Sequence, residues 1–251
     1  MILAIQHEDG TGPGLVGERI AAAGVALDLR CPFQGDDLPS TLEGYEGLLV
    51  LGGTPGTYDV DIAPWLPHAR DLLREAVRDQ VPTLGVCLGG QLLAAACGGE
   101  VAVAARPQVG LYGLRAHPAA ADDRLFAGFP ADGQAVQWHW DEITSLPPGA
   151  VPLLWDADFP FQAYRLGPVA WGVQFHPEVL LDSARAWAKD ESGKLARLGV
   201  DVAGMLCRIE AAEPALRALW GGVADRWIGV VGSHPAAPGA DHRETAMRPA
   251  E

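Results

Sequence analysis

The chain has 251 residues, 49% of them hydrophobic, and carries a formal net charge of −14. This length is compatible with one large domain or two small ones, and it allows a sizeable core that needs neither a disulfide nor a metal. The acidic balance argues against nucleic acid or an anionic membrane as the main partner. The cysteines are scattered at Cys31, Cys87, Cys97 and Cys207, which is typical of neither a disulfide framework nor a zinc site.

The amino-terminal segment has no targeting signal that we can identify. Met1 leads directly into a short apolar run that lacks the length and the basic leader of a signal peptide. Asp, Arg or Gly interrupts every longer apolar run, so no membrane-spanning segment is predicted. We therefore expect a cytoplasmic protein, where thiols stay reduced.

Strands and helices alternate in the first half of the chain. Apolar runs predict strands at 2–6, 25–29, 47–51 and 81–86, and amphipathic runs predict helices at 15–23 and 65–80. This alternation is typical of parallel β-α-β units, in which helices cover both faces of the sheet. Ligands of such sheets gather at the carboxyl ends of the strands.

The second half begins with short strands and ends with helices. Strand-like runs separated by Pro, Gly and Asp occur at 101–104, 111–116, 135–138, 152–155, 162–165 and 170–175. They predict a more antiparallel portion added to the parallel core. Helical patterns return from about Leu180 and again over 200–227. We expect one domain over residues 1–232 and a flexible tail over 233–251, where Pro, Ala and charged residues are frequent.

Cys87 is the most informative residue of the chain. It follows an apolar run and is flanked by Gly85, Gly89 and Gly90, a pattern that predicts a strand, a tight turn and a helix with the thiol at the bend. A helix amino terminus there would favour the thiolate. The alternative is a buried cysteine that serves only as a small hydrophobic side chain.

A base and its orienting carboxylate are found far downstream of Cys87. His176 and Glu178 stand two residues apart at the end of an apolar run, so on an extended chain they share a face. Cysteine, imidazole and carboxylate together make a triad for nucleophilic catalysis. This partner pair favours a catalytic role for Cys87 over the structural one.

Two further segments carry candidate site residues. Glycines after the third strand predict close backbone approach to a ligand, and the amides of Gly53 and Leu88 are candidates for an oxyanion hole. His139 and Asp141, in the stretch Gln-Trp-His-Trp-Asp, are a second candidate base pair. Because no nucleophile signature adjoins them, we favour a structural or substrate-lining role for His139.

With these residues in view, the chain resembles the class I, triad-type glutamine amidotransferase family. The resemblance rests on Gly-Val-Cys-Leu-Gly-Gly-Gln at 85–91 and Gln-Phe-His-Pro-Glu at 174–178, and it is closest to free-standing members. It implies a flavodoxin-like, mostly parallel sheet flanked by helices, with an added antiparallel portion. It also implies an enzyme that needs no cofactor or metal.

The resemblance also implies a role for each matching residue. Cys87 would attack the γ-amide of glutamine and form a γ-glutamyl thioester. His176 would protonate the departing ammonia and then activate water, and Glu178 would orient His176. Gly53 and Leu88 would hold the oxyanion. The substrate-binding residues would be Gln91, which contacts the glutamyl group, and His139 and Trp140, which line its amino-acid end.

The chain departs from the family pattern in two respects. We find no ATP-pyrophosphatase loop of a synthetase domain, and Gln108 stands where relatives often carry Glu. We therefore predict an amidohydrolase that acts on glutamine or another γ-glutamyl small molecule. The alternatives are a glutaminase subunit that delivers ammonia to a separate synthetase and a non-catalytic binding module on the same fold.

Overall fold

The computed structural model of the protein describes residues 1–234. The helices are α1 Gly14–Ala22, α2 Leu66–Arg78, α3 Leu88–Ala96, α4 Leu181–Asp190, α5 Ser192–Arg197 and α6 Val202–Ser233. The expected flexible tail lies outside the described residues from position 235 onward, and its first residue, Ser233, is the last residue of α6. No helix in the described stretch of the chain has the length and apolar character needed to cross a membrane.

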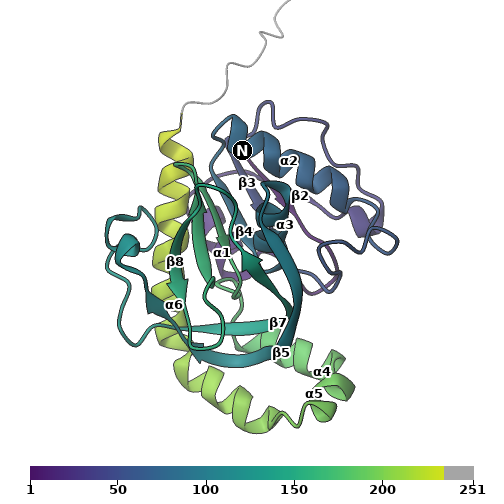
Figure 1. The fold of residues 1–251 in the computed structure, drawn as a ribbon, viewed down its shortest axis with the longest axis vertical. Coiled ribbons are helices and arrows are strands. Elements are labelled where there is room, and N and C mark those ends of the chain that lie inside the picture. Colours follow the sequence, from purple (N-terminus) through teal and green to yellow (C-terminus); the bar gives the residue numbers. More distant parts are fainter. Residues whose placement is uncertain (235–251) are drawn as a thin grey trace, which may run out of the picture.

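The central feature is an eight-stranded sheet in the order β2-β1-β3-β4-β10-β9-β8-β6 (Figure 1). Its strands are β1 Ile2–Ile5, β2 Leu27–Arg30, β3 Gly47–Val50, β4 Thr83–Val86, β6 Arg115–Ala116, β8 Val151–Trp155, β9 Ala163–Leu166 and β10 Ala170–Val173. The first five strands in this order are parallel and the last three are antiparallel to their neighbours. The predicted fold class, a mostly parallel α/β sheet with an antiparallel portion, is confirmed.

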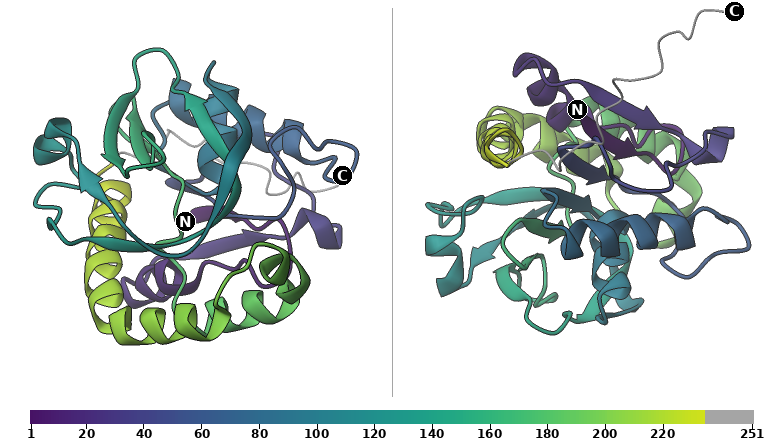
Figure 2. Two further views of the ribbon diagram at one scale, coloured as in Figure 1. Left: turned by 60° about the horizontal axis from the view of Figure 1, so that its bottom comes forward. Right: turned by 90° about the horizontal axis from the view of Figure 1, so that it is seen from above.

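Helices cover both faces of the sheet, as its side-chain pattern dictates. Alternate residues of β1 belong to opposite cores: Ile2 packs with α1 and α6, whereas Leu3 packs with α2 and α3. Figure 2 shows α2 and α6 on opposite sides of the strands. All residues of β1, β3, β4 and β10 are buried, which is typical of parallel strands covered on both faces.

A second sheet pairs two long strands, β5 Glu100–Gly113 and β7 Gln134–Ser145. The prediction of separate strands at 101–104 and 111–116 was therefore wrong. One strand, β5, runs from Glu100 through Pro107 and Gly110 to Gly113, and only Arg115–Ala116 forms a separate strand, β6. The register shifts between Val103 and Gln108, and this irregular stretch accommodates a proline that an ordinary ladder excludes.

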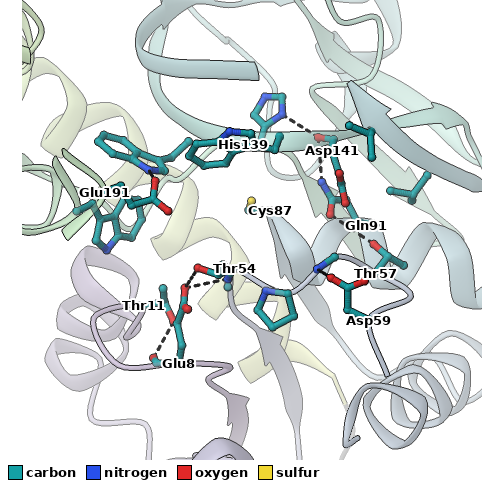
Figure 3. Close-up of a pocket in the computed structure, with 18 of the residues that line it drawn as sticks. Glu8, Thr11, Thr54, Thr57, Asp59, Cys87, Gln91, His139, Asp141 and Glu191 are labelled. Carbon is teal, nitrogen blue, oxygen red and sulfur yellow. Dashed lines mark hydrogen bonds between the residues drawn. The ribbon is translucent and has the colours of Figure 1, made fainter. Parts of the chain in front are cut away.

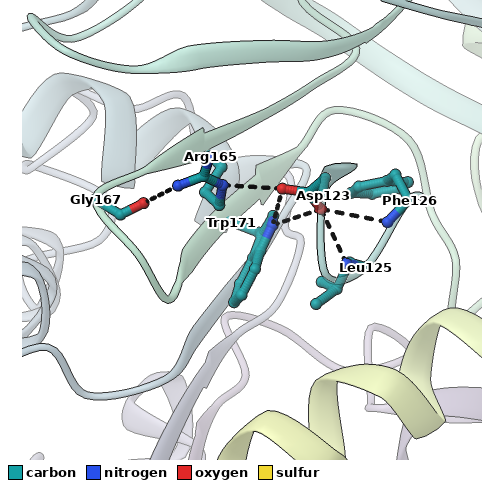
Figure 4. Close-up of polar contacts among 6 residues, drawn as sticks. All are labelled: Asp123, Leu125, Phe126, Arg165, Gly167 and Trp171. Atoms are coloured by element: carbon teal, nitrogen blue, oxygen red, sulfur yellow. Dashed lines mark hydrogen bonds and ion pairs between the residues drawn. The ribbon is translucent and has the colours of Figure 1, made fainter. Parts of the chain in front are cut away.

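A buried carboxylate ties the loop after β6 to the antiparallel strands (Figure 4). Asp123 accepts hydrogen bonds from the backbone amides of Leu125 and Phe126 at 2.9 and 3.2 Å. It also accepts from Arg165 of β9 at 2.9 Å and from the Trp171 indole of β10 at 3.1 Å. A buried charge is tolerated because every partner is a donor.

Packing at the amino end of α3 explains the glycines that flank Cys87. A Cβ at Gly89 would overlap the carbonyl oxygen of Val50 in β3, and a Cβ at Gly90 would lie 2.6 Å from the carbonyl oxygen of Val173 in β10. The close approach of α3 to two strand ends therefore requires residues without side chains.

We predict that Gly89→Ala lowers the free energy of unfolding by about 1–3 kcal/mol or more, because the added methyl group meets rigid backbone. Gly229→Ala in α6 is the matched control. A Cβ there meets nothing within 4 Å, and alanine gains up to about 1 kcal/mol in a helix. Urea unfolding of both variants measures the difference. Equal stability of the two variants would contradict the packing argument.

Candidate active site

Cys87 lies at the turn between β4 and α3, with φ 50° and ψ −107°. Its backbone N–H donates to the carbonyl of Val173 in β10 at 2.8 Å. Only Gln80 shares a positive φ among the non-glycine residues that the structure describes. This uncommon backbone conformation is the one that a nucleophile elbow requires, since it turns the side chain out of the strand toward the sheet edge.

His176 and Glu178 follow β10, which is the strand beside β4. The Nδ1 atom of His176 lies 2.8 Å from Oε1 of Glu178, and both side chains are buried. The Nε2 atom of His176 has no hydrogen-bond partner within the described structure. The carboxylate therefore fixes the ring and leaves the second nitrogen for a ligand or the nucleophile.

The surroundings of His176 favour its charged form. Burial is the largest single effect and lowers its pKa, but the Glu178 carboxylate and the Cys87 sulfur together outweigh it and raise the pKa to about 10. Opposite charge at short range inside a protein has this effect on an imidazole. The ring can therefore hold a proton at neutral pH and donate it to a leaving group.

Gly52 and Gly53 bring the loop after β3 against Cys87 and His176. A Cβ at Gly52 would lie 3.0 Å from Cε1 of His176 and 3.6 Å from Cβ of Cys87. A Cβ at Gly53 would lie 3.4 Å from Cδ2 of Leu88, the first residue of α3. The two residues expected to form an oxyanion hole are thus neighbours. Neither of their amides has a hydrogen-bond acceptor within residues 1–234.

A cavity of about 510 Å³ opens at this edge of the sheet (Figure 3). Cys87 and His176 line it, as do Gln91, His139 and Trp140, the three residues expected to bind substrate. The volume lies within the range of small-molecule sites. The structure thus brings Cys87, His176 and the predicted substrate-binding residues to one cavity, with Glu178 behind His176.

A chain of amides connects the cavity wall to the sulfur. Nε2 of Gln91 lies 3.1 Å from the carbonyl oxygen of Asp141 and 3.2 Å from Oε1 of Gln174. The backbone carbonyl can only accept, so it fixes the orientation of the Gln91 amide and, through it, that of Gln174. Nε2 of Gln174 then faces Sγ of Cys87 at 3.8 Å. Gln174 is not among the site residues predicted from the sequence, although it lies inside the Gln-Phe-His-Pro-Glu motif.

His139 does not form the histidine–carboxylate pair that was considered as an alternative base. Its Nδ1 atom lies 2.8 Å from the backbone carbonyl of Asp141, not from the carboxylate, and its Nε2 atom lies 3.2 Å from Oε1 of Gln108. Burial lowers the pKa of His139 to about 4. Gln108 also donates to the buried carboxylate of Asp156 at 3.0 Å. His139 therefore belongs to a buried polar network that supports one wall of the cavity.

His7 is another buried histidine, and it lies near the loop after β3 that contains Gly53. The Trp65 indole donates to its Nδ1 atom at 3.0 Å, and burial lowers its pKa to about 4. A Cβ at Gly53 would lie 2.7 Å from Cβ of His7. The Cβ atom of His7 therefore packs directly against the loop that carries one of the candidate oxyanion donors.

A cysteine at a strand-to-helix turn, a histidine–glutamate pair just after the adjacent strand and a mostly parallel sheet define an α/β protein with a candidate cysteine site at the sheet edge. The model of the class-I glutamine amidotransferase family matches residues 16–190. The chain belongs to this family, which confirms the resemblance seen in its motifs.

Solved structures of the family share the whole fold. A glutamine amidotransferase from Methylobacillus flagellatus is 28% identical, with a TM-score of 0.84 and 98% of both chains covered. A glutamine amidotransferase from Thermotoga maritima is 26% identical, with a TM-score of 0.82, 90% of this chain and 97% of that one covered.

Curated relatives are longer proteins. The GMP synthase (glutamine-hydrolyzing) of Thermomicrobium roseum is 35% identical over 165 residues, which cover 66% of this chain and 29% of the relative. The aminodeoxychorismate synthase of Streptomyces griseus is 34% identical over 142 residues, which cover 56% of this chain and 18% of the relative. The chain thus spans less than a third of the length of these relatives.

We predict that Glu178→Gln moves the alkaline limb of kcat/KM for glutamine hydrolysis from near pH 10 to lower pH. The variant loses the charge that raises the pKa of His176, and we expect kcat to fall by about 100-fold or more. Rates measured from pH 6 to 10.5 test this. Glu210→Gln, at an exposed position of α6, is the control. An unmoved limb in Glu178→Gln would contradict the assignment.

The same pair makes the free energy of unfolding depend on pH. Because the folded-state pKa of His176 lies above its ordinary value of 6.5, the stabilisation is complete below pH 6.5 and is lost as the pH rises through about 10. Glu178→Gln should weaken this alkaline loss of stability, which thermal unfolding at a series of pH values measures.

We predict that Gln174→Glu slows alkylation of Cys87 by iodoacetamide at pH 7 by about tenfold or more, because a carboxylate oxygen replaces the N–H that faces the sulfur. Glutamate keeps the shape of glutamine and an acceptor for Gln91, so a role in packing alone predicts little change. The exposed Cys207 is an internal control, since its alkylation rate should be unaffected. Unchanged reactivity of Cys87 would contradict a direct effect of Gln174 on the sulfur.

Proposed function

We propose that the protein is a cysteine-dependent amidohydrolase that cleaves the γ-amide of glutamine or of another γ-glutamyl compound. The observation that carries the proposal is that Cys87 and His176 line one cavity, with Glu178 bound to the His176 ring, in a chain of the class-I family. These three residues come from two adjacent strand ends although 89 positions separate His176 from Cys87.

The first half of the proposed reaction forms a thioester. Sγ of Cys87 attacks the γ-carbonyl carbon, and the negative charge that develops on the carbonyl oxygen is stabilised by the amides of Gly53 and Leu88. The C–N bond then breaks, and the nitrogen leaves with the proton of His176. A raised pKa lets the imidazolium exist before the leaving group needs its proton.

The second half returns the enzyme to its starting state. His176, now neutral, accepts a proton from water, whose oxygen attacks the thioester carbonyl. The C–S bond breaks, glutamate is released and the sulfur again faces the imidazolium. Glu178 holds the ring in one orientation through both halves.

Gln91 and His139 are assigned to the glutamyl portion of the substrate in this proposal. Trp140, which was expected at the same end, lies against the Lys194 ammonium and is assigned to the leaving-group portion. Gln91 lines the cavity from the first turns of α3, and its amide is held by Asp141 and Gln174. The Asp141 carboxylate faces the cavity on the same side. Its pKa is raised mainly by burial and to a lesser extent by the negative charge of Asp59. A substrate ammonium group would relieve the repulsion between these two carboxylates.

A glutaminase subunit that passes ammonia to a separate synthetase is the second candidate. The GMP synthase and the aminodeoxychorismate synthase described above each extend beyond the matched region by more than twice its length. Large apolar side chains that line the cavity are exposed at its rim, namely Tyr58 at 55% and Val103 at 80%. Such a rim is consistent with a protein partner at the cavity mouth.

We predict that the purified protein releases ammonia from glutamine and that Cys87→Ser lowers kcat by at least about 10³-fold, because the hydroxyl is a far weaker nucleophile at neutral pH. Coupled glutamate dehydrogenase assays measure the ammonia. Cys207→Ser, at an exposed position on α6, is the matched control and should keep the wild-type rate. Full activity of Cys87→Ser would overturn the proposal.

The two candidates differ in what the isolated chain does. An independent hydrolase turns over alone. A glutaminase subunit hydrolyses glutamine faster when an ATP-using protein that copurifies from cell extract is added back. If no such protein is recovered and the isolated chain turns over efficiently, the subunit function is excluded.

A further inference from the structure

The cavity has two chemically distinct ends around Cys87 (Figure 3). On one side lie the polar groups closest to the proposed glutamyl position, which are Thr57, Asp59, Gln91 and Asp141. On the other side lie Glu8 and Glu191. A substrate whose γ-carbonyl sits at the sulfur therefore places its glutamyl moiety on the first side and its leaving group on the second.

The position of His176 shows which end receives the leaving group. Its ring packs edge-on against Trp187 with 4.9 Å between centroids, and Trp187 packs in the same manner against Trp138 at 5.6 Å. The indole of Trp138 donates to Oε2 of Glu191 at 2.9 Å. The proton donor thus adjoins the end that contains Glu191. Its Nε2 atom is buried and unpartnered within the described chain, and the His176 side chain borders the cavity.

This leaving-group end is anionic and aromatic. Glu8 and Glu191 border it, and their neighbours in the chain, Asp9 and Asp190, also line the cavity. Contacts with Glu191, Lys194 and His176 place the indoles of Trp138, Trp140 and Trp187 at this end. Carboxylates beside indole faces are the surroundings that bind alkylammonium groups, through charge and cation–π attraction. They disfavour a second carboxylate, as a peptide leaving group would carry.

The chain itself places an alkylammonium group at this end. Nζ of Lys194 lies 2.8 Å from Oε1 of Glu191 and 4.8 Å from the ring centroid of Trp140. Lys194 is the only lysine or arginine among the described residues that line the cavity. Its contacts show that Glu191 and Trp140 accommodate a primary ammonium on a flexible alkyl chain.

We propose that the preferred substrate is the γ-glutamyl amide of a diamine or polyamine, whose distal ammonium group binds between Glu8, Glu191 and Trp140. This inference rests on the proposed hydrolase function and specifies its leaving group. The sulfur attacks the γ-carbonyl, the C–N bond breaks, and the amine departs with the His176 proton. Water then cleaves the thioester, so the products are glutamate and the free diamine with no other reactant.

The cavity supports this assignment by its size as well as its charge. A volume of about 510 Å³ lies in the range that holds drug-sized ligands. Ammonia, the leaving group of glutamine, is too small to reach the three indoles of the leaving-group end. A diamine arm of four or more carbons would extend past His176 along these rings.

The test compares kcat/KM for three synthetic amides that differ at one position. They are the γ-glutamyl amides of 1,4-diaminobutane, of butylamine and of 4-aminobutanoate, with glutamine as reference. We expect the diaminobutane amide to exceed the butylamine amide by at least about fivefold, as modest, partly exposed ion pairs allow. The 4-aminobutanoate amide should be the poorest substrate. The preference should shrink when salt is added.

Substitutions of the two partners of the Glu191–Lys194 ion pair should shift the kcat/KM ratio of the diaminobutane amide to the butylamine amide in opposite directions. Glu191→Gln keeps an acceptor for Trp138 and removes the charge, so the diaminobutane-to-butylamine ratio should fall. Lys194→Met removes the competing ammonium, so the ratio should rise. Asp182→Asn, in α4 and outside the cavity lining, makes the same charge change as Glu191→Gln and should leave the ratio unchanged.

The outcomes separate this inference from the proposed function. If glutamine is hydrolysed but the butylamine or 4-aminobutanoate amide is turned over as well as or better than the diaminobutane amide, the inference alone is overturned. A ratio that is the same in Glu191→Gln as in the wild type would also overturn it. Loss of turnover on glutamine and on all three amides would refute the proposed function and the inference together.

Discussion

The backbone of Cys87 is the constraint on which the rest of the site depends. A non-glycine residue at φ 50° costs on the order of 1–3 kcal/mol, and it persists only where the surroundings hold it. Here its N–H is bound to the Val173 carbonyl, and α3 begins immediately after it, pressed through Gly89 and Gly90 onto the ends of β3 and β10. Relaxing this turn would withdraw the sulfur from the cavity.

The register of the sheet supplies the other half of the geometry. Val86 pairs with Val173 in the parallel ladder of β4 and β10, so the residues after both strands emerge at the same edge. Cys87 follows one strand directly, and His176 follows the other three residues on. The loop after β3 emerges beside them and contributes Gly52 and Gly53. A fold whose stability comes from buried apolar strands therefore fixes polar groups at one edge.

The electrostatics of the edge are sustained by burial. His176 and Glu178 have side chains only 3% and 2% exposed, and Nδ1 of the ring lies 2.8 Å from Oε1 of the carboxylate. Nε2 of His176 and Oε2 of Glu178 are buried without a partner within the described residues. Around them the cavity is anionic, with Lys194 as the sole lysine or arginine of its described lining. The charged form of His176, which its raised pKa favours, therefore lies beside a cavity lined mainly by acidic and neutral side chains.

Most of the parallel half and the turn that holds Cys87 can be predicted from the sequence, because short-range patterns determine them. The apolar runs, the glycines around Cys87 and the spacing of His176 and Glu178 are local signals. The continuous strand β5 was not predicted, since Pro107 indicates a break unless the pairing irregularity is known. The roles of Gln174, Glu8 and Glu191 depend on contacts between distant segments, which periodicity does not encode.

Covalent trapping tests the central claim most directly. In the proposed mechanism the backbone of Cys87 turns its side chain toward the cavity. Cys87 must therefore react with an electrophile that resembles glutamine. Peptide mapping by mass spectrometry after treatment with a diazo-ketone analogue of glutamine should find one label per chain, on Cys87, with free glutamine protecting the site. A label distributed over Cys31, Cys97 and Cys207, or none on Cys87, would contradict the account.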